Sequence, residues 1–443
     1  MRYSKIILTT AIYLSCQPTF AAGFGLNENS ADAMAVSYAG SAATAADASY
    51  LAYNPASAAD VNCYDSSVNA VAIFPTSRAR YTAAMTSAGS NTGGSADPTS
   101  FVQKALVPEY ALRARLSERW AIGLVVSAPW GFTTSYPSTW VGRYYAQTTR
   151  LMSVNAMPVV SYEVSPRLSV GAGLQIEYAH GKLTSAVDTG TLGYLYGVPG
   201  SIPGGQDSQA TYRANSWGVG LTAGVLWQVD DRLRLGLSYR SSVSHRMKGP
   251  LTFALDSAGI GQALRSASGL FTDTIAKSSM TMPDIVRFGA RYALNDRWTL
   301  LTEADWTNWH RFHELRIIPA NPAQPDDVTG AGWGDGWFYS IGADYLLDED
   351  WHVRAGAGYD ATPIPATTLS PRIPDGSRAW MSVGARYQFS RTTTIDLSYA
   401  HLCNSDGHVS QSPTQIGNSL RGWLAGTTTS SINAVSLEIS FHT

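Results

Sequence analysis

The most regular feature of this chain is an alternation of apolar and polar residues with a period of two. Between residues 168 and 179, the even positions carry apolar or aromatic side chains and the odd positions carry mostly polar or small ones. The same pattern, with apolar odd positions, returns at 233–240 and 351–360. Because successive side chains of a strand point to opposite faces, each such segment has one apolar face and one polar face.

Counting such segments predicts an all-β chain of 14 antiparallel strands. The predicted strands are 66–77, 106–116, 119–130, 150–163, 167–184, 211–229, 232–247, 280–293, 297–313, 336–347, 350–361, 377–390, 393–403 and 431–441.

The connections between these strands alternate in length. Six are short and polar, at 117–119, 165–166, 230–231, 295–296, 348–349 and 390–391. The other seven run from about 14 to about 33 residues. Alternating short turns and long loops are typical of outer-membrane β-barrels, where the short turns face the periplasm and the long loops the outside. We therefore predict a closed transmembrane barrel in the outer membrane, with both chain ends on the periplasmic side.

The composition favours one large closed sheet over two or three globular domains. Only 14% of the 443 residues are charged, against about 25% in ordinary globular proteins. The 40 Gly, 23 Tyr and 13 Trp suit a lipid-facing band flanked by aromatic girdles. A net charge of −2 gives no reason to expect nucleic acid as a partner.

The first residues have the pattern of a secretory signal peptide. Arg2 and Lys5 precede an apolar stretch from 6 to 14, and small residues follow at Ala21 and Ala22. We predict a signal peptide over 1–21 with cleavage at Ala21 or Ala22; a lipoprotein modified at Cys16 is the less favoured alternative. Residues 22–64 lack strand alternation and carry helix-like stretches at 30–38 and 44–51, which predicts a partly helical plug, or hatch, inside a barrel of residues 65–443.

Two long loops, 185–210 and 250–279, are unusually apolar. One interpretation is a small loop core packed over the barrel, and the other is a hydrophobic capture groove at the cell surface. The candidate groove residues are Leu192, Tyr194, Tyr196, Phe253, Leu264, Leu270 and Phe271.

A set of motifs in chain order resembles the FadL/TodX family of outer-membrane transporters for long-chain fatty acids and hydrocarbons. The motifs are Ala22-Gly23-Phe24-Gly25-Leu26-Asn27-Glu28, Tyr38-Ala39-Gly40, Asn54-Pro55-Ala56, Ala128-Pro129-Trp130-Gly131, Gly142-Arg143-Tyr144, Trp306-Thr307-Asn308-Trp309 and Ile373-Pro374-Asp375-Gly376-Ser377-Arg378. Together they cover nearly the whole chain after the signal peptide.

The resemblance implies capture between the long loops, a lumenal site at the mature N-terminus and a sideways exit through the wall. On this chain it places the lumenal site at Phe24, Leu26, Trp130, Phe132 and Arg143. It places the exit at a kink in the third strand, at Ser127, Ala128 and Pro129, facing Asn54, Pro55 and Ala56 of the hatch. Pro129 has no N–H for strand pairing and restricts the residue before it, so a kink is physically reasonable, although the same proline could simply end the strand.

Charged residues on the polar faces include both signs, and we expect them to pair with one another and with the plug. They are Glu177, Arg234, Arg240, Arg287, Arg291, Glu303, Asp305, Arg354, Asp360, Arg386, Asp396 and Glu438. The loop region 317–341, where the resemblance implies a cation for a fatty-acid carboxylate, contains no Lys or Arg. This departure favours neutral hydrocarbons more than the resemblance alone would. His180, Lys182, Arg143 and Arg150 are the other candidate anion partners.

The prediction is a monomeric, passive transporter of hydrophobic small molecules, most simply fatty acids, with neutral aromatic or aliphatic hydrocarbons as the alternative. It would contact membrane lipid and lipopolysaccharide and be inserted by the barrel-assembly machinery. A surface adhesin or phage receptor is a further alternative that would need neither plug nor exit. No enzyme, cofactor or metal is expected: His310 and His313 are three apart and face opposite sides of a strand, and no nucleophile elbow or phosphate loop occurs.

Overall fold

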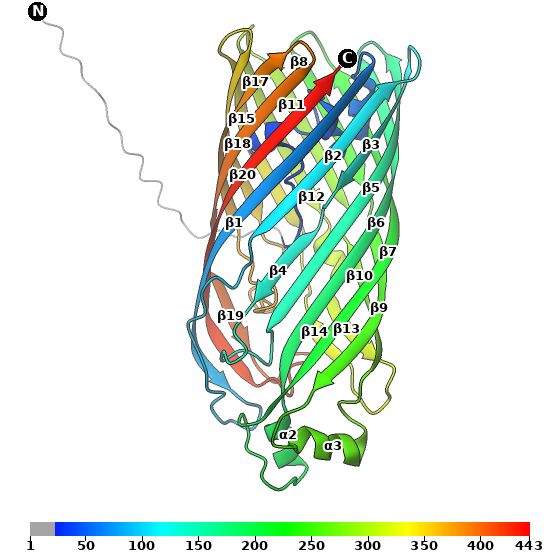
Figure 1. Cartoon of the computed structure of the whole chain (residues 1–443). Coiled ribbons are helices and arrows are strands. Elements are labelled where there is room, and N and C mark those ends of the chain that lie inside the picture. Colours follow the sequence, from blue (N-terminus) through cyan, green and yellow to red (C-terminus); the bar gives the residue numbers. More distant parts are fainter. Residues whose placement is uncertain (1–22) are drawn as a thin grey trace, which may run out of the picture.

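The structure is a computed structural model that describes residues 23–443, so the predicted signal peptide lies outside the described residues. Its strand segments join into one antiparallel sheet that closes as a 14-stranded barrel (Figure 1). The segments are β1 (Tyr64–Met85), β2 (Ala105–Arg115), β3 (Trp120–Ser127), β4 (Gly131–Ser135), β5 (Thr148–Ser165), β6 (Leu168–Asp188), β7 (Asp207–Gln228), β8 (Leu233–Arg240), β9 (Val243–Ala254), β10 (Thr274–Met282), β11 (Ile285–Ala293), β12 (Trp298–Thr307), β13 (Glu314–Pro319), β14 (Asp327–Gly330), β15 (Gly336–Leu346), β16 (Trp351–Ala361), β17 (Arg378–Ser390), β18 (Thr393–Asn404), β19 (Gly407–Gln411) and β20 (Trp423–His442).

The first and last strands close the barrel. β1 pairs with β20 along nearly their full lengths, from Asp65 opposite His442 to Met85 opposite Trp423. This closure pairs the two terminal strands, which would otherwise be exposed edges in the lipid. The predicted fold class is confirmed.

The two faces of the strands are divided as the alternation predicts. On β16, Val353 points outward and is 46% exposed, whereas its neighbour Arg354 is buried in the lumen. On β6, Leu174 is exposed and Gln175 is buried. The apolar positions therefore form the outer surface, and the polar positions line the inside.

The two ends of the barrel differ as the connection lengths predict. The short turns lie at the same end as the C-terminus, and the helices α2 (Thr189–Leu195) and α3 (Ile260–Ser268) lie among the loops at the other end (Figure 1). Several strands run further into the loops than expected: β9 reaches Ala254, β7 begins at Asp207 and β20 begins at Trp423. The loops at these three strand ends are correspondingly shorter than predicted.

The segment before β1 packs inside the barrel. It contains the short helix α1 (Ala31–Ala35) and the 3-10 helices η1 (Ala48–Ala52) and η2 (Pro55–Ala59); a third 3-10 helix, η3 (Trp309–Arg311), follows β12. Ser30, Asp47 and Asn54 cap α1, η1 and η2 by accepting backbone N–H groups. Within residues 23–443, no helix has the length and apolar character needed to cross a membrane.

Ion pairs hold this plug to the wall. Arg386 of β17 contacts Asp47 of the plug at 2.6 Å and Asp396 of β18 at 2.9 Å. Arg354 contacts both Asp32 of the plug and Asp396. The carboxylate of Glu438 accepts hydrogen bonds from the Ser30 hydroxyl and the Ala31 N–H. The expectation that the inward charges pair with each other and with the plug is met at these positions.

Candidate substrate passage

The wall of the barrel is interrupted between β2 and the β3–β4 pair. β2 pairs with β3 only from Tyr110 opposite Val126 to Arg115 opposite Ala121. Further out, the chain before β2 rejoins β4 through the Gln103 N–H, which donates to the Thr133 carbonyl at 3.0 Å. Between these contacts, no backbone hydrogen bond joins residues 104–109 to residues 127–132 in the described chain.

The bend at Ser127, Ala128 and Pro129 separates β3 from β4. Pro129 lacks the N–H that a continuous strand would donate at this point. Its carbonyl accepts the Leu26 N–H at 2.9 Å, and the Gly131 N–H donates to the Phe24 carbonyl at 3.1 Å. The N-terminal segment therefore pairs with the bent strand from inside the barrel.

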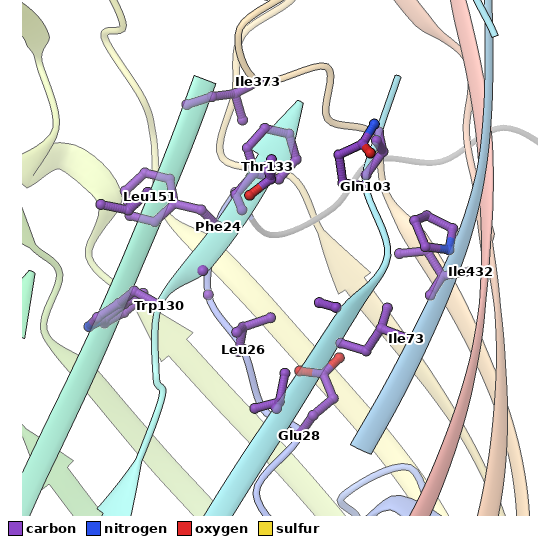
Figure 2. Close-up of a pocket in the computed structure, with 18 of the residues that line it drawn as sticks. Phe24, Leu26, Glu28, Ile73, Gln103, Trp130, Thr133, Leu151, Ile373 and Ile432 are labelled. Carbon is purple, nitrogen blue, oxygen red and sulfur yellow. The ribbon is translucent and has the colours of Figure 1, made fainter. Parts of the chain in front are cut away.

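A cavity of about 350 Å³ lies at this interruption. Figure 2 shows Phe24 and Leu26 between the strands that carry Leu151 and Ile73. The lining also includes Leu106, which is 69% exposed on the lipid-facing side of β2. The cavity thus reaches from the N-terminal segment in the lumen to the outer surface of the wall.

Phe24 is enclosed by aromatic side chains. Its ring lies 6.1 Å from that of Trp130, 4.8 Å from Trp309, 5.9 Å from Phe312 and 5.6 Å from Trp333, centroid to centroid. All five side chains are buried. We call these five residues the aromatic cluster. Such a cluster offers a large apolar surface to a hydrophobic ligand.

Polar groups fix the chain on either side of Phe24. The Gly23 N–H donates to the Asp375 carboxylate at 2.8 Å, and Arg378 pairs with the same carboxylate at 3.2 Å. Burial raises the pKa of Asp375, and Arg378 opposes that rise. Burial likewise raises the pKa of Glu28, which Arg378 also counters.

A second cavity, of about 520 Å³, lies among the extracellular loops. We call it the outer cavity. Five of the seven predicted groove residues line it: Leu192, Tyr196, Phe253, Leu270 and Phe271. Leu264 is instead buried in the loop core and Tyr194 points to solvent. The loops therefore pack a core and also enclose a cavity, and ligand capture in that cavity stays a prediction.

The remaining predicted residues lie in different places. Phe132 and Arg150 line the cavity at the interruption. Arg143 pairs with Asp207 at 2.5 Å, so its charge is used within the loops. His180 and Lys182 line neither of these two cavities.

The Asn54-Pro55-Ala56 motif packs beneath β5, β6 and β7. The Asn54 amide donates to the carbonyls of Ala42 at 2.7 Å and Val225 at 3.0 Å, and the Pro55 carbonyl accepts the Ser161 hydroxyl at 3.0 Å. The bend takes its hydrogen bonds from residues 24–26 instead. The hydrogen bonds to the bend therefore come from the N-terminal segment, while those of Asn54 and Pro55 go to Ala42, β5 and β7; a gating role of Asn54-Pro55-Ala56 stays a prediction.

Sequence reasoning missed three members of the aromatic cluster as site residues: Trp309, Phe312 and Trp333. Trp309 and Phe312 fall within the predicted strand 297–313, but β12 ends at Thr307 and the 3-10 helix η3 follows it, so that part of the strand prediction was wrong. Trp333 lies in a loop between β14 and β15. A possible signal for Trp333 is its position in a run of glycines, Gly330-Ala331-Gly332-Trp333-Gly334, since a large aromatic residue has no evident use in a purely flexible loop.

Comparison with known proteins decides the family. A model of the family "Outer membrane protein transport protein (OMPP1/FadL/TodX)" matches residues 12–442. The chain belongs to this family. The long-chain fatty acid transport protein of Escherichia coli K12 is 27% identical to it, over 96% of this chain and 97% of that protein. Outer membrane protein P1 of Haemophilus influenzae is 26% identical over 92% and 91%, respectively.

Solved structures of relatives share the fold. A Pseudomonas aeruginosa FadL homologue superposes with a TM-score of 0.85 at 23% identity, over 95% of this chain and 100% of that one. The toluene transporter TodX of P. putida gives a TM-score of 0.67 at 16% identity, over 95% and 99%. This FadL/TodX-family protein is thus an outer-membrane β-barrel whose relatives are transporters and channels.

Proposed function

We propose that this protein takes up long-chain fatty acids by passive diffusion and releases them sideways into the outer membrane. The route runs from the outer cavity, past the aromatic cluster, and out between β2 and β4. The proposal extends the family assignment to a substrate class and an exit.

The observation that carries the sideways exit is the cavity at the wall interruption. It is lined on the lumen side by Phe24 and on the lipid side by Leu106 and Met152, and strand pairing is missing where it lies. An alkyl chain exposed to water costs about 0.8 kcal/mol per CH₂, so a twelve-carbon tail released into the periplasm would lose on the order of 10 kcal/mol. Release into the bilayer avoids this cost, and diffusion down a gradient then needs no energy source.

Movement of the N-terminal segment would control the exit. A Cβ atom added at Gly131 would lie 2.9 Å from the Leu26 side chain, so Leu26 packs directly on the bent strand. Within the described residues, two backbone hydrogen bonds join this segment to Pro129 and Gly131, so a ligand entering the aromatic cluster could break this contact at modest cost.

Fatty acids are favoured over neutral hydrocarbons by the relatives. The relatives named for long-chain fatty acid transport are 27% identical to this chain, whereas the toluene transporter TodX is 16% identical. Neutral hydrocarbons remain the second candidate. We further propose that the protein works as a monomer, inserted by the barrel-assembly machinery and surrounded by lipid and lipopolysaccharide.

Deleting Ala128 and Pro129 tests the exit. A straightened β3–β4 strand would pair with β2 and close the interruption, so uptake of labelled oleate by whole cells should fall by about tenfold or more. The control deletes Ala88 and Gly89, in the turn that follows β1. Heat-dependent gel mobility should show both variants folded. Normal uptake by the folded Ala128–Pro129 deletion would refute the sideways exit.

A further inference from the structure

Arg372 lies where the outer cavity approaches the aromatic cluster. It belongs to the loop of residues 362–377, which connects β16 to β17. Arg372 lines the outer cavity and also a small cavity of about 40 Å³ lined by Phe312 and Trp333. The next residue, Ile373, lines this small cavity and the cavity at the wall interruption. A ligand moving from the loops to the lumen would therefore pass Arg372.

Within the described residues, no hydrogen bond or ion pair joins the guanidinium of Arg372 to a protein group, and the carboxylate of Asp327 acts on it only through its electrostatic field. The side chain is 5% exposed, its Nη1 atom is buried without a hydrogen bond, and no ion pair joins it to a carboxylate. A buried charge is normally paired, so an unpaired one marks either a costly defect or a binding site.

The other charged groups of the outer cavity already have partners. Asp327 pairs with Arg421, and Asp326 pairs with Arg316 at 2.9 Å. Asp188 accepts the Thr191 N–H at 2.7 Å and the Gly204 N–H at 3.1 Å. Arg372 is thus the one charged group lining this cavity that, within the described residues, forms neither an ion pair nor a side-chain hydrogen bond.

The Arg372 side chain is charged, and hydrogen bonds hold its backbone in place. Burial lowers its pKa to about 10, and the carboxylate of Asp327 opposes that fall, so the guanidinium is a cation at neutral pH. The backbone is fixed by the Thr134 hydroxyl, which donates to the Arg372 carbonyl at 3.1 Å. The Tyr136 hydroxyl donates to the Pro371 carbonyl at 3.0 Å. A binding group on a fixed backbone loses little freedom when its ligand arrives.

We propose that Arg372 binds the carboxylate of a fatty acid whose alkyl chain lies against the apolar lining of the outer cavity. The inference rests on the proposed function and deepens it, because it names the group that distinguishes an anionic amphiphile from a neutral hydrocarbon. A guanidinium pairs with a carboxylate through two parallel hydrogen bonds. It supplies the cation that the region 317–341 lacks.

The test compares two ligands that differ only in their head group, oleate and oleyl alcohol. Binding is measured by tryptophan fluorescence of the full-length protein in lipid nanodiscs. Arg372→Met keeps most of the side-chain volume and removes the charge, so oleate affinity should fall by about tenfold or more while oleyl alcohol affinity stays within about twofold. Arg372→Lys should recover part of the oleate affinity. The matched control, Arg316→Met, removes a loop cation that is already paired.

Three outcomes separate the inference from the proposed function. If Arg372→Met binds oleate as the wild type does, or loses both ligands equally while folded, Arg372 is not the carboxylate partner and only the inference fails. If acetate competes with oleate at similar concentration, the site is a simple anion site and the inference again fails. If the wild type binds and transports neither ligand, the proposed function itself fails.

Discussion

Different kinds of contact hold the N-terminal segment in the two halves of the lumen. In the periplasmic half, the plug is fixed by buried ion pairs, with Arg354 and Arg386 each shared between a plug carboxylate and Asp396 of the wall. In the outer half, Phe24 is held by ring contacts in the aromatic cluster, and the loops enclose a cavity lined by Arg372, which forms no ion pair within residues 23–443.

This difference suits one half of the lumen to closing the barrel and the other half to letting a ligand through. Buried ion pairs are directional, and losing one partner leaves a charge without compensation, so a network of them fixes a single geometry. Apolar contacts are non-directional, and a ligand chain can replace a side chain of similar surface. The periplasmic half is therefore suited to a fixed closure, and the outer half to a path that a hydrophobic ligand opens.

The largest expected effect comes from removing an ion pair that holds the plug in the periplasmic half. Arg386→Met leaves Asp47 without its ion-pair partner and Asp396 with only Arg354, which should destabilise the seated plug by about 3–5 kcal/mol. The strand pairing of the barrel is untouched, so the barrel should stay folded while its conductance in planar bilayers rises. Arg297→Met, in an exposed periplasmic turn, is the control. Closed channels in the Arg386 variant would show that the ion pairs do not hold the plug.

The next largest effect is expected from removing a ring of the aromatic cluster in the outer half. Phe24→Ala removes the central ring of the aromatic cluster, so ligand affinity should fall by about tenfold, measured by tryptophan fluorescence. The plug should stay seated, because its ion pairs are unchanged. Phe389→Ala removes a lipid-facing ring as the control. Unchanged affinity in the Phe24 variant would argue against a ligand site at this cluster.

A smaller effect is expected at Asn54, which caps η2 of the plug, and it tests whether the plug and the exit are independent. Asn54→Ala removes the cap of η2 and two hydrogen bonds to carbonyls, which should cost the plug about 1–2 kcal/mol. Amide exchange over residues 54–60 should increase, with oleate uptake unchanged, because the bend is bonded to residues 24–26. In Asn54→Asp, which keeps a capping oxygen, the amide exchange rate should lie between those of the wild type and Asn54→Ala. Lost uptake with unchanged amide exchange would instead mean that Asn54 acts directly at the exit.

The smallest effect is a pH dependence at the junction of the halves. Burial raises the folded-state pKa of Asp375 above the usual 3.8, with Arg378 opposing, so the folded protein binds this proton more readily than the unfolded one. The carboxyl therefore favours folding most at low pH, and this contribution is lost as the pH rises from 3.8 through the folded pKa. Relative to Asp375→Asn, the wild type should gain on the order of 1 °C in Tm on acidification. A gain on raising the pH would contradict the sign.

The strands were predictable from sequence because lipid and lumen impose opposite chemistry on alternate residues. Val353 and Arg354 are adjacent in the chain and lie on opposite faces of the wall. Beyond the membrane this constraint is absent, which explains why the outer ends of β7, β9 and β20 were placed too close to the barrel.

The site was predictable only where a motif carried it. Phe24, Leu26 and Trp130 belong to recognisable motifs, and all three line the cavity at the wall interruption. Trp333 and Arg372 come from two different loops, and only the folding of both loops over the lumen places them around one small cavity. No local pattern in the sequence encodes that meeting.

The pairing of β1 with β20 has a consequence for biogenesis. Residues 23–63 are enclosed by a ring whose two ends are the first and the last strand to be synthesised. After those two strands pair, the plug can no longer enter sideways through the wall. Its two remaining routes are to lie inside the curling sheet before closure, or to enter along the barrel axis from the periplasmic end, where residue 63 joins β1.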